Sequence, residues 1–441
     1  MTFKEIADTI FAASPADETE VVYRRRDDSL TRFANNHIHQ NVTETNHEIL
    51  VRCVSGSRCG TAVSNVTDVA SLRKLPNTAF DLARQQPENP DFRGLPGATR
   101  LEPTNGFDES VASCSPSLRA QGVGVVCRKA AEAGYTAAGS MMTGRNSFGV
   151  ANSKGVFAET ETTLVDASTV VMSQTSSGWA QASGWKLDSV TWEELADEAV
   201  RKTRMGVDPQ VAEPGEYTVI LDPYATADLL SMMAVDGMSA LAYQEERSWL
   251  NGRTGQKVMS QNVTIVDDGL DPSGIPTPFD AEGQSKQRVI IVDAGVARAP
   301  VYDSYTAGRE AGARSTGHAL ESPTDRMGPL PMNLFLMPGT SNVEEMIAST
   351  SRGLYITRFW YTRTVHPRDV VVTGMTRDGT FMVRDGEIAG AVKSMRFTQS
   401  YLDALAGALA IGKQGRTLWG PGAYHVPPVK LGRFNFTSST R

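Results

Sequence analysis

The sequence predicts an α+β protein in two parts: an N-terminal α/β domain with an antiparallel sheet, and a C-terminal strand-rich domain with a few helices. A chain of 441 residues exceeds the usual size of a single core. Polar and β-branched residues alternate over residues 20–65, which is typical of an antiparallel meander with one face in water. A cluster of proline and glycine over residues 207–219 then marks a boundary. We therefore expect domains at residues 1–210 and 211–441.

The N-terminal domain is expected to begin with a helix, followed by the strand meander over residues 20–65. Apolar residues recur at helical spacing near the start of the chain: Phe3, Ile6, Ala7, Ile10 and Phe11. Turn-forming residues predict reversals of the meander near Asp27–Asp28, Asn35–Asn36 and Ser55–Gly56. A further helix is expected over residues 71–86, which Pro76 should bend or split.

The second part of this domain spans residues 110–206, after an irregular connection rich in Pro, Gly and Asn. Residues 117–134 are a helix candidate with weak caps, and two strand runs follow it. The last helix of this part is signalled by Thr191 and Glu194, which match a capping box, and by Gly206, which supplies a C-terminal stop.

The C-terminal domain is expected to contain many strands around a helical segment at residues 222–250. Asp222 and Pro223 suit the N-cap and the first position of a helix. An apolar stripe follows them, formed by Leu229, Leu230 and Met233. Asn251–Gly252 predicts the end of a second helix, and residues 400–412 predict a late one.

The composition argues against nucleic-acid and membrane partners. The net charge of −7 leaves no basic surface for a phosphate backbone, and the one basic run, Arg24–Arg26, is followed at once by two aspartates. No stretch reaches the ~20 apolar residues that a membrane span requires. The start of the chain lacks the basic and apolar regions of a signal peptide. We therefore expect a cytoplasmic protein.

Neither nucleophile motifs nor metal motifs are evident in the sequence. There is no G-x-S-x-G elbow, no phosphate-binding glycine loop and no H-E-x-x-H, and the four cysteines form no C-x-x-C pair. His37 and His39 should share one face of a strand, and with His47 on a neighbouring strand they would suit zinc. The alternative is that all three are half-exposed strand histidines. An acidic cluster at residues 267–282 lacks the spacing of a calcium loop and fits a loop between strands.

Residues 251–283, "NGRTGQKVMSQNVTIVDDGLDPSGIPTPFDAEG", contain the strand-like runs "GRTGQKV" and "NVTIVDD" and the turn "DAEG". Further segments follow in order, namely "QRVIIVDAGV", "IASTSRGLYITRF" and residues 380–412, and the N-terminal half contributes "LVRCVSGSRCGTAVSN" and "VANSKG". In order and spacing these segments resemble the TldD/PmbA (TldE) metallopeptidase-related family. The resemblance covers most of residues 20–415.

The resemblance also implies where the metal site of the family should lie. Members with peptidase activity carry His-Glu-x-x-x-His upstream of the G-[EQ]-[KR]-V strand and a cysteine near the C-terminus. Counting back from Gly255, the helix positions fall on Ser231, Met232 and Asp236, and no cysteine follows Cys127. Aspartate can ligate zinc, but serine is a poor zinc ligand, and methionine cannot act as a general base. The resemblance therefore implies a degenerate motif, with no catalytic residue and no cofactor in this chain.

This departure resembles the TldE/PmbA branch, the partner subunit of the TldD peptidase. It implies a heterodimer in which zinc belongs to a TldD-like subunit and the peptide substrate binds as an added strand. The complex would process or degrade small unstructured peptides, as in leader-peptide removal and small-protein proteolysis.

Two alternatives remain open at this point. One is an independent hydrolase or tailoring enzyme that acts on peptides or amino-acid conjugates. Besides Asp236, its candidate cavity-lining residues are Glu245, Glu246, Asp280, Glu282 and His318. Glu245 and Glu246 could instead lie on a solvated helix face. The other alternative is a peptide-binding, chaperone-like homodimer.

Overall fold

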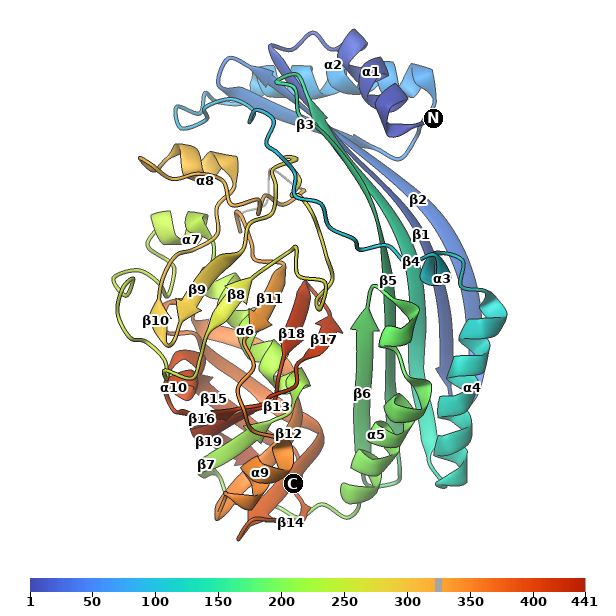
Figure 1. The fold of residues 1–441 in the computed structure, drawn as a ribbon, viewed down its shortest axis with the longest axis vertical. Coiled ribbons are helices and arrows are strands. Elements are labelled where there is room, and N and C mark those ends of the chain that lie inside the picture. Colours follow the sequence, from blue (N-terminus) through green and yellow to red (C-terminus); the bar gives the residue numbers. More distant parts are fainter. Residues whose placement is uncertain (322–326, 441) are drawn as a thin grey trace.

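The computed structural model describes residues 1–321 and 327–440 and has the predicted α+β fold, with its strands in three sheets (Figure 1). The N-terminal half forms one long curved sheet. The C-terminal half forms two smaller sheets that lie beside it. Within the described ranges, no helix is both long and apolar enough to cross a membrane.

The N-terminal sheet is antiparallel throughout, in the strand order β3-β2-β1-β4-β5-β6. Its strands are β1 (Glu18–Ala34), β2 (His37–Ser55), β3 (Arg58–Ser64), β4 (Thr136–Asn152), β5 (Phe157–Met172) and β6 (Ser177–Gly184). A bulge between Arg32 and Phe33 shifts the pairing of β1 with β2, so that Glu20 lies opposite Arg52.

Two of the expected turns of the meander are present, and the third is wrong. Asn35 and Asn36 join β1 to β2 with φ angles of 52° and 62°, left-handed values that asparagine tolerates. Gly56, with a φ of 62°, lies in the turn between β2 and β3. Asp27–Asp28 instead lies in the middle of β1, paired with both β2 and β4. The side chains there are partly in water, so two acidic residues do not interrupt the strand.

Helices cover the two ends of this sheet. They are α1 (Phe3–Ala13), α2 (Val69–Gln85), α3 (Glu109–Ala112), α4 (Pro116–Glu132), the short 3-10 helix η1 (Leu187–Ser189) and α5 (Trp192–Met205). Helices α1 and α2 pack with one end of β1 and β2, whereas α4 and α5 pack near the other end (Figure 1). Strands β1 and β4 therefore contribute to two separate apolar clusters, one near each end.

Several local expectations for the N-terminal half need correction. Pro76 does not split its helix, which continues to Gln85 because α2 buries an apolar face along β2 and β3. Thr191 precedes α5 but makes no side-chain cap hydrogen bond. Gly206 follows α5 with a φ of −84°, so it does not form a left-handed stop. His47 is on β2 itself, the strand that also carries the other two histidines, and not on a neighbouring strand.

Five strands of the C-terminal half close into a ring by the pairings β12–β7, β7–β19, β19–β15, β15–β13 and β13–β12. They are β7 (Gly215–Leu221), β12 (Arg352–His366), β13 (Val371–Arg384), β15 (Met395–Ser400) and β19 (Val429–Ser439). The strands β14 (Glu387–Ala391) and β16 (Ala408–Ile411) pair with β13 and β19 outside this ring, and η2 (Pro367–Asp369) joins β12 to β13.

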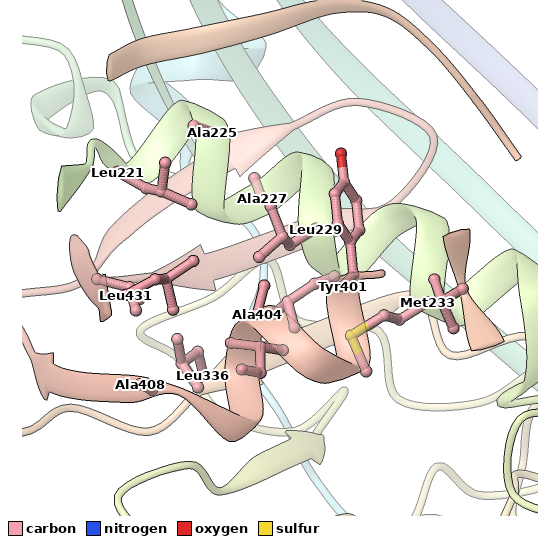
Figure 2. Packing of buried hydrophobic residues seen from close by; sticks show 14 of the residues in the cluster. Leu221, Ala225, Ala227, Leu229, Met233, Leu336, Tyr401, Ala404, Ala408 and Leu431 are labelled. Atoms are coloured by element: carbon pink, nitrogen blue, oxygen red, sulfur yellow. The ribbon is translucent and has the colours of Figure 1, made fainter. Parts of the chain in front are cut away.

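The other C-terminal sheet has the order β10-β9-β8-β11-β18-β17. Its strands are β8 (Ile265–Asp267), β9 (Val289–Asp293), β10 (Val296–Ala297), β11 (Asn333–Leu336), β17 (Arg416–Trp419) and β18 (Ala423–Val426). Helix α6 (Pro223–Gly237) packs on β12 of the ring and on β18 of this sheet. Figure 2 shows Leu229 and Met233 of α6 in the core they share with Tyr401 and Leu431.

The helical segment expected over residues 222–250 is shorter than predicted. After α6, helix α7 (Ala240–Gln244) ends well before Asn251, and turns follow it. Asp222 is the N-cap of α6, but its carboxylate makes no cap hydrogen bond because it pairs with Lys202 of α5. The remaining helices are α8 (Ser304–Gly308), α9 (Val343–Ala348) and α10 (Tyr401–Ala406).

The two halves of the chain meet where β6 lies against β17. The Gln181 Nε2 donates to the carbonyl of Trp419 over 2.9 Å, and the Trp419 N–H donates to Ser183 Oγ over 3.0 Å. Nearby, Trp185 Nε1 donates to the carbonyl of Pro272 over 2.9 Å. The N-terminal sheet and the loops of the C-terminal half therefore share a continuous contact.

Candidate functional site

Helix α6 carries the three positions that the sequence compares with a metallopeptidase motif. Asp236 is only 8% exposed, and Thr364 Oγ1 on β12 lies 3.0 and 2.8 Å from its two carboxylate oxygens. Burial raises the pKa of Asp236 to about 6, and the Thr364 hydrogen bond opposes this rise. A side-chain hydrogen bond thus connects Asp236 of α6 to β12 of the five-strand ring.

The other two positions are occupied by half-buried side chains. Met232 packs against the large core cluster of the C-terminal half. Burial raises the pKa of Tyr424 on β18, and its interaction with Ser231 opposes this rise. Over residues 1–321 and 327–440, no three His, Cys, Asp or Glu side chains are grouped so that they could hold a metal ion.

A second carboxylate on α6, that of the half-buried Asp228, was not among the residues predicted from the sequence. Tyr401 donates its hydroxyl to Asp228 Oδ1 over 2.9 Å, and Thr362 donates to Oδ2 over 2.8 Å. Burial raises the pKa of Asp228 to about 6 despite these two donors. Its sequence signal is weak: it is one of two acidic residues in a mostly apolar helix, and nothing local indicates its two partners.

A cavity of about 400 Å³ lies away from these α6 positions, between the N-terminal sheet and the loops of the C-terminal half. Two of the predicted residues, Glu245 and Glu282, line it, and Glu246 is exposed and is not part of its lining. Strands β1 and β2 contribute Glu20, Leu50 and Arg52 to its wall.

Glu282 and Asp280 lie in the loop that reaches the N-terminal sheet. The Ser304 N–H donates to Glu282 Oε2 over 3.0 Å, and Glu282 Oε1 lies 3.5 Å from Arg52 Nη2. The Asp280 side chain is buried. Its carboxylate accepts hydrogen bonds from three backbone N–H groups, those of Glu282, Gln284 and Ala319. Burial and the adjacent Glu282 carboxylate nevertheless raise the pKa of Asp280 to about 7.

His318 is 1% exposed and is not part of the cavity lining. Its Nε2 lies 2.8 Å from Asp267 Oδ1, and its Nδ1 lies 2.9 Å from Thr316 Oγ1. Burial and the buried Lys286 lower the pKa of His318. A Thr-His-Asp array of this kind resembles a nucleophile triad only in its atoms, because a substrate has no route to a fully enclosed imidazole.

The pair formed by Glu20 and Arg52 was missed by sequence reasoning. Arg52 Nη2 lies 2.7 Å from Glu20 Oε1, and both residues line the cavity. Burial raises the pKa of Glu20 to about 7, although the Arg52 charge opposes this rise. Glu20 and Arg52 are far apart in the sequence and meet only through the register of β1 with β2.

Comparison with known proteins places this geometry in a family. The C-terminal domain of the PmbA/TldA metallopeptidases matches residues 214–438, just over half of the chain, and the central domain of the same family matches residues 119–206. A metalloprotease of Methanothermobacter thermautotrophicus is 24% identical over 220 residues, which are 50% of this chain and 47% of that protein. The metalloprotease TldD homolog of Haemophilus influenzae is 28% identical over 167 residues, 37% of this chain and 34% of that protein.

The similarity to solved structures extends over nearly the whole chain. The crystal structure of TldE from Thermococcus kodakarensis superposes with a TM-score of 0.90, covers 99% of both chains and is 18% identical. That likeness concerns the fold, whereas the sequence alignments span less than half of each of the two curated relatives. On the match of its C-terminal and central domains, the chain belongs to the PmbA/TldD metallopeptidase family.

Proposed function

We propose that this chain is a non-catalytic partner subunit of a TldD/TldE-type zinc metallopeptidase complex that processes or degrades small unstructured peptides. The observation that carries the proposal is the state of α6. The helix is packed between the ring and the other C-terminal sheet, yet its motif positions are Ser231, Met232 and Asp236. Ser231 and Met232 lack the chemistry of a zinc-bound histidine or a general base. Asp236 could ligate a metal or accept a proton, but its carboxylate is hydrogen-bonded to Thr364, and no second and third ligand are grouped with it among the described residues.

In such a complex the zinc would be held by a TldD-like subunit, and this chain would contribute a wall and binding edges. One open edge supports this role. Strand β3 pairs with β2 only from Ile49 to Ser55, so the outer edge of His37–Glu48 pairs with no strand of the described residues. The side chains there are polar except for Ile38 and Val42, and most of them are exposed. An edge of this kind accepts an additional strand through main-chain hydrogen bonds, which read little sequence.

The test is reconstitution with a TldD-like chain that carries His-Glu-x-x-x-His. We expect neither chain alone to cleave an unstructured fluorogenic peptide, and the mixture to cleave it until a chelator removes the zinc. Replacing the first motif histidine of the TldD-like chain by alanine should abolish cleavage. Asp236→Asn in this chain should leave the rate of the mixture within about twofold of the original, because no zinc-bound water depends on that carboxylate.

Two results would contradict the proposal. One is tightly held zinc at one ion per chain in the isolated protein, measured by plasma emission spectrometry. The other is cleavage by this chain alone that resists chelators, which would establish the independent hydrolase instead.

A further inference from the structure

The cavity between the two halves contains a carboxylate with an unused oxygen. Glu20 is 2% exposed and lines the cavity, and its Oε1 pairs with Arg52 Nη2. Its Oε2 is buried and has no hydrogen-bond partner among the described residues, and Arg52 Nε is likewise unpartnered. A buried, unsatisfied carboxylate oxygen is costly, so its presence beside an open volume indicates room for a donor that the chain does not supply.

The charge around this oxygen favours a cation. Five carboxylates line the cavity, namely Glu20, Glu245, Glu282, Asp303 and Glu321. The lining contains two cationic side chains, Arg52 and Arg309. Arg52 is shared by Glu20 and Glu282, and Arg309 lies 3.5 Å from Asp91, which is not part of the lining. Glu245 and Glu321 pair with Arg247 and Arg24, which lie outside the lining. Glu20 and Glu282 have only Arg52 between them, so this end of the described lining keeps an excess of negative charge that one additional positive group would balance.

The remainder of the wall is apolar. Its apolar side chains are Leu50, Phe92, Leu241, Ala281, Ala319 and Leu320. A volume of about 400 Å³ is at the small end of the range for ligand sites, enough for an amine with a short alkyl or aryl group. The lining thus combines carboxylates that can accept hydrogen bonds from a charged donor with apolar side chains that can contact the rest of a ligand.

We propose that this cavity binds a primary ammonium group carried on a small apolar body, with the ammonium donating to Glu20 Oε2 and the apolar part lying against Leu50, Leu241 and Phe92. Glu282 would add charge at the same end, because its Oε1 also points towards Arg52. The N-terminal residue of a peptide and a free small amine share this chemistry. The proposal stands on the cavity alone and does not require the chain to be a peptidase subunit.

The simplest competing explanation is that Glu20 is protonated in the empty protein and binds nothing. Isothermal titration calorimetry on the full chain at pH 8 separates the two, with 2-phenylethylamine as the probe and 2-phenylethanol as its neutral counterpart. We expect the amine to bind at least tenfold more tightly than the alcohol. Equal affinities, or no heat with the amine at millimolar concentration, would overturn the proposal.

Variants locate the binding. Glu20→Gln keeps the shape of the side chain and removes its charge, and it should weaken amine binding at least tenfold. Glu387→Gln, an exposed carboxylate on β14 that is not part of the cavity lining, is the matched control and should leave binding unchanged. If Glu20→Gln does not fold, Glu245→Lys at an exposed position of the lining is the second variant. The added lysine should repel the ammonium group and weaken amine binding about threefold or more. An unchanged affinity in whichever of these two variants folds would overturn the assignment.

A separate titration distinguishes a peptide N-terminus from a free small amine as the source of the ammonium group. The tripeptide Phe-Gly-Gly is titrated with a free N-terminus and with an acetylated one. Binding of the free form only assigns the site to peptide N-termini. Binding of phenylethylamine without either peptide supports the same ammonium site and assigns it to small amines.

Discussion

Glu20, Asp228, Asp236 and Asp280 are carboxyl groups whose ionised form is deprived of water. Burial is the largest cause of the raised pKa in each of the four. Their neighbours compensate to different degrees: Asp228 receives two hydroxyl donors, whereas Glu20 has an arginine on one oxygen and, within the described part of the chain, no partner on the other. A fold that retains such groups loses some stability near neutral pH. Carboxyl groups with strongly raised pKa values are more common at functional sites than elsewhere.

The free energy of unfolding should therefore fall as the pH rises from about 5 to 8. The unfolded Glu20 loses its proton near pH 4.5 and the folded one near pH 7, so between these values the folded state holds more protons and a rise in pH destabilises it. The raised pKa of Glu20 alone corresponds to ~3 kcal/mol. Urea denaturation at pH 5, 6.5 and 8 measures the slope.

The control for this prediction is a pair of variants. Glu20→Gln should flatten the pH dependence, because it removes one of the four groups, and the exposed Glu387→Gln should keep the original slope. A stability that rises over the same interval would show that these carboxyls are not protonated as the buried geometry requires.

Glu20 and Arg52 show why part of this cavity could not be derived from the sequence. The turn at Asn35–Asn36 is predictable from its two asparagines, and counting outward from it places Glu20 opposite Val51. The bulge after Arg32 moves the register by one residue and brings Arg52 into that place instead. A one-residue shift changes the face on which a side chain lies, and the sequence carries no local signal for this bulge.

At the scale of single elements, α6 shows which features of a helix are local. Its start was predictable, because Asp222 and Pro223 occupy the N-cap and first position. Its end was not, because the groups that satisfy its last carbonyls come from later in the chain. Trp249 Nε1 donates to the carbonyl of Met233 over 2.9 Å, and Ser248 Oγ donates to that of Gly237. These contacts explain why α7 is short: residues after Gln244 turn back onto α6 instead of continuing a helix.

Because α6 is held by its apolar face, shortening one core side chain should destabilise the whole C-terminal half. Leu229 is fully buried in the cluster of Figure 2. We expect Leu229→Ala to lower the free energy of unfolding by about 2–5 kcal/mol. Val235, on the same helix, is 45% exposed, and Val235→Ala should cost less than about 1 kcal/mol. Chemical denaturation followed by tryptophan fluorescence compares the two, and equal effects would mean that α6 is not packed as described.

At the scale of the whole molecule, a buried lysine joins the two halves. Lys202 on α5 has no exposed surface, and its Nζ lies 2.6 Å from Glu198 Oε1 and also pairs with Asp222 at the start of α6. The other oxygen of Glu198 lies 2.7 Å from Arg416 Nη1 on β17. The domain boundary near residue 210 stays a prediction from the Pro- and Gly-rich segment there. The joint could not be predicted from the sequence, because it pairs a residue on α5 with the residue expected to act as a helix cap.

Removing this lysine should leave two carboxylates in the interior with one remaining arginine. We expect Lys202→Met to lower the free energy of unfolding by about 3–5 kcal/mol, since breaking a buried pair costs far more than breaking an exposed one. Lys4 pairs with Asp8 on the surface, with 70% and 62% of the two side chains exposed. Lys4→Met should change stability by less than about 1 kcal/mol. If both variants lose the same amount, the joint does not hold the halves together.

The unbroken pairing of β1 has a consequence for how its middle responds to solvent. Arg25 and Arg26 are exposed, yet β1 is bonded to β2 on one side and to β4 on the other along this stretch. Amide hydrogens there should exchange with deuterium as slowly as those of a core strand, while an arginine-selective reagent modifies the same two residues rapidly. The middle of the sheet would then have a rigid main chain and chemically accessible side chains. A rigid main chain there would hold the two helix-covered ends of the sheet at a fixed distance.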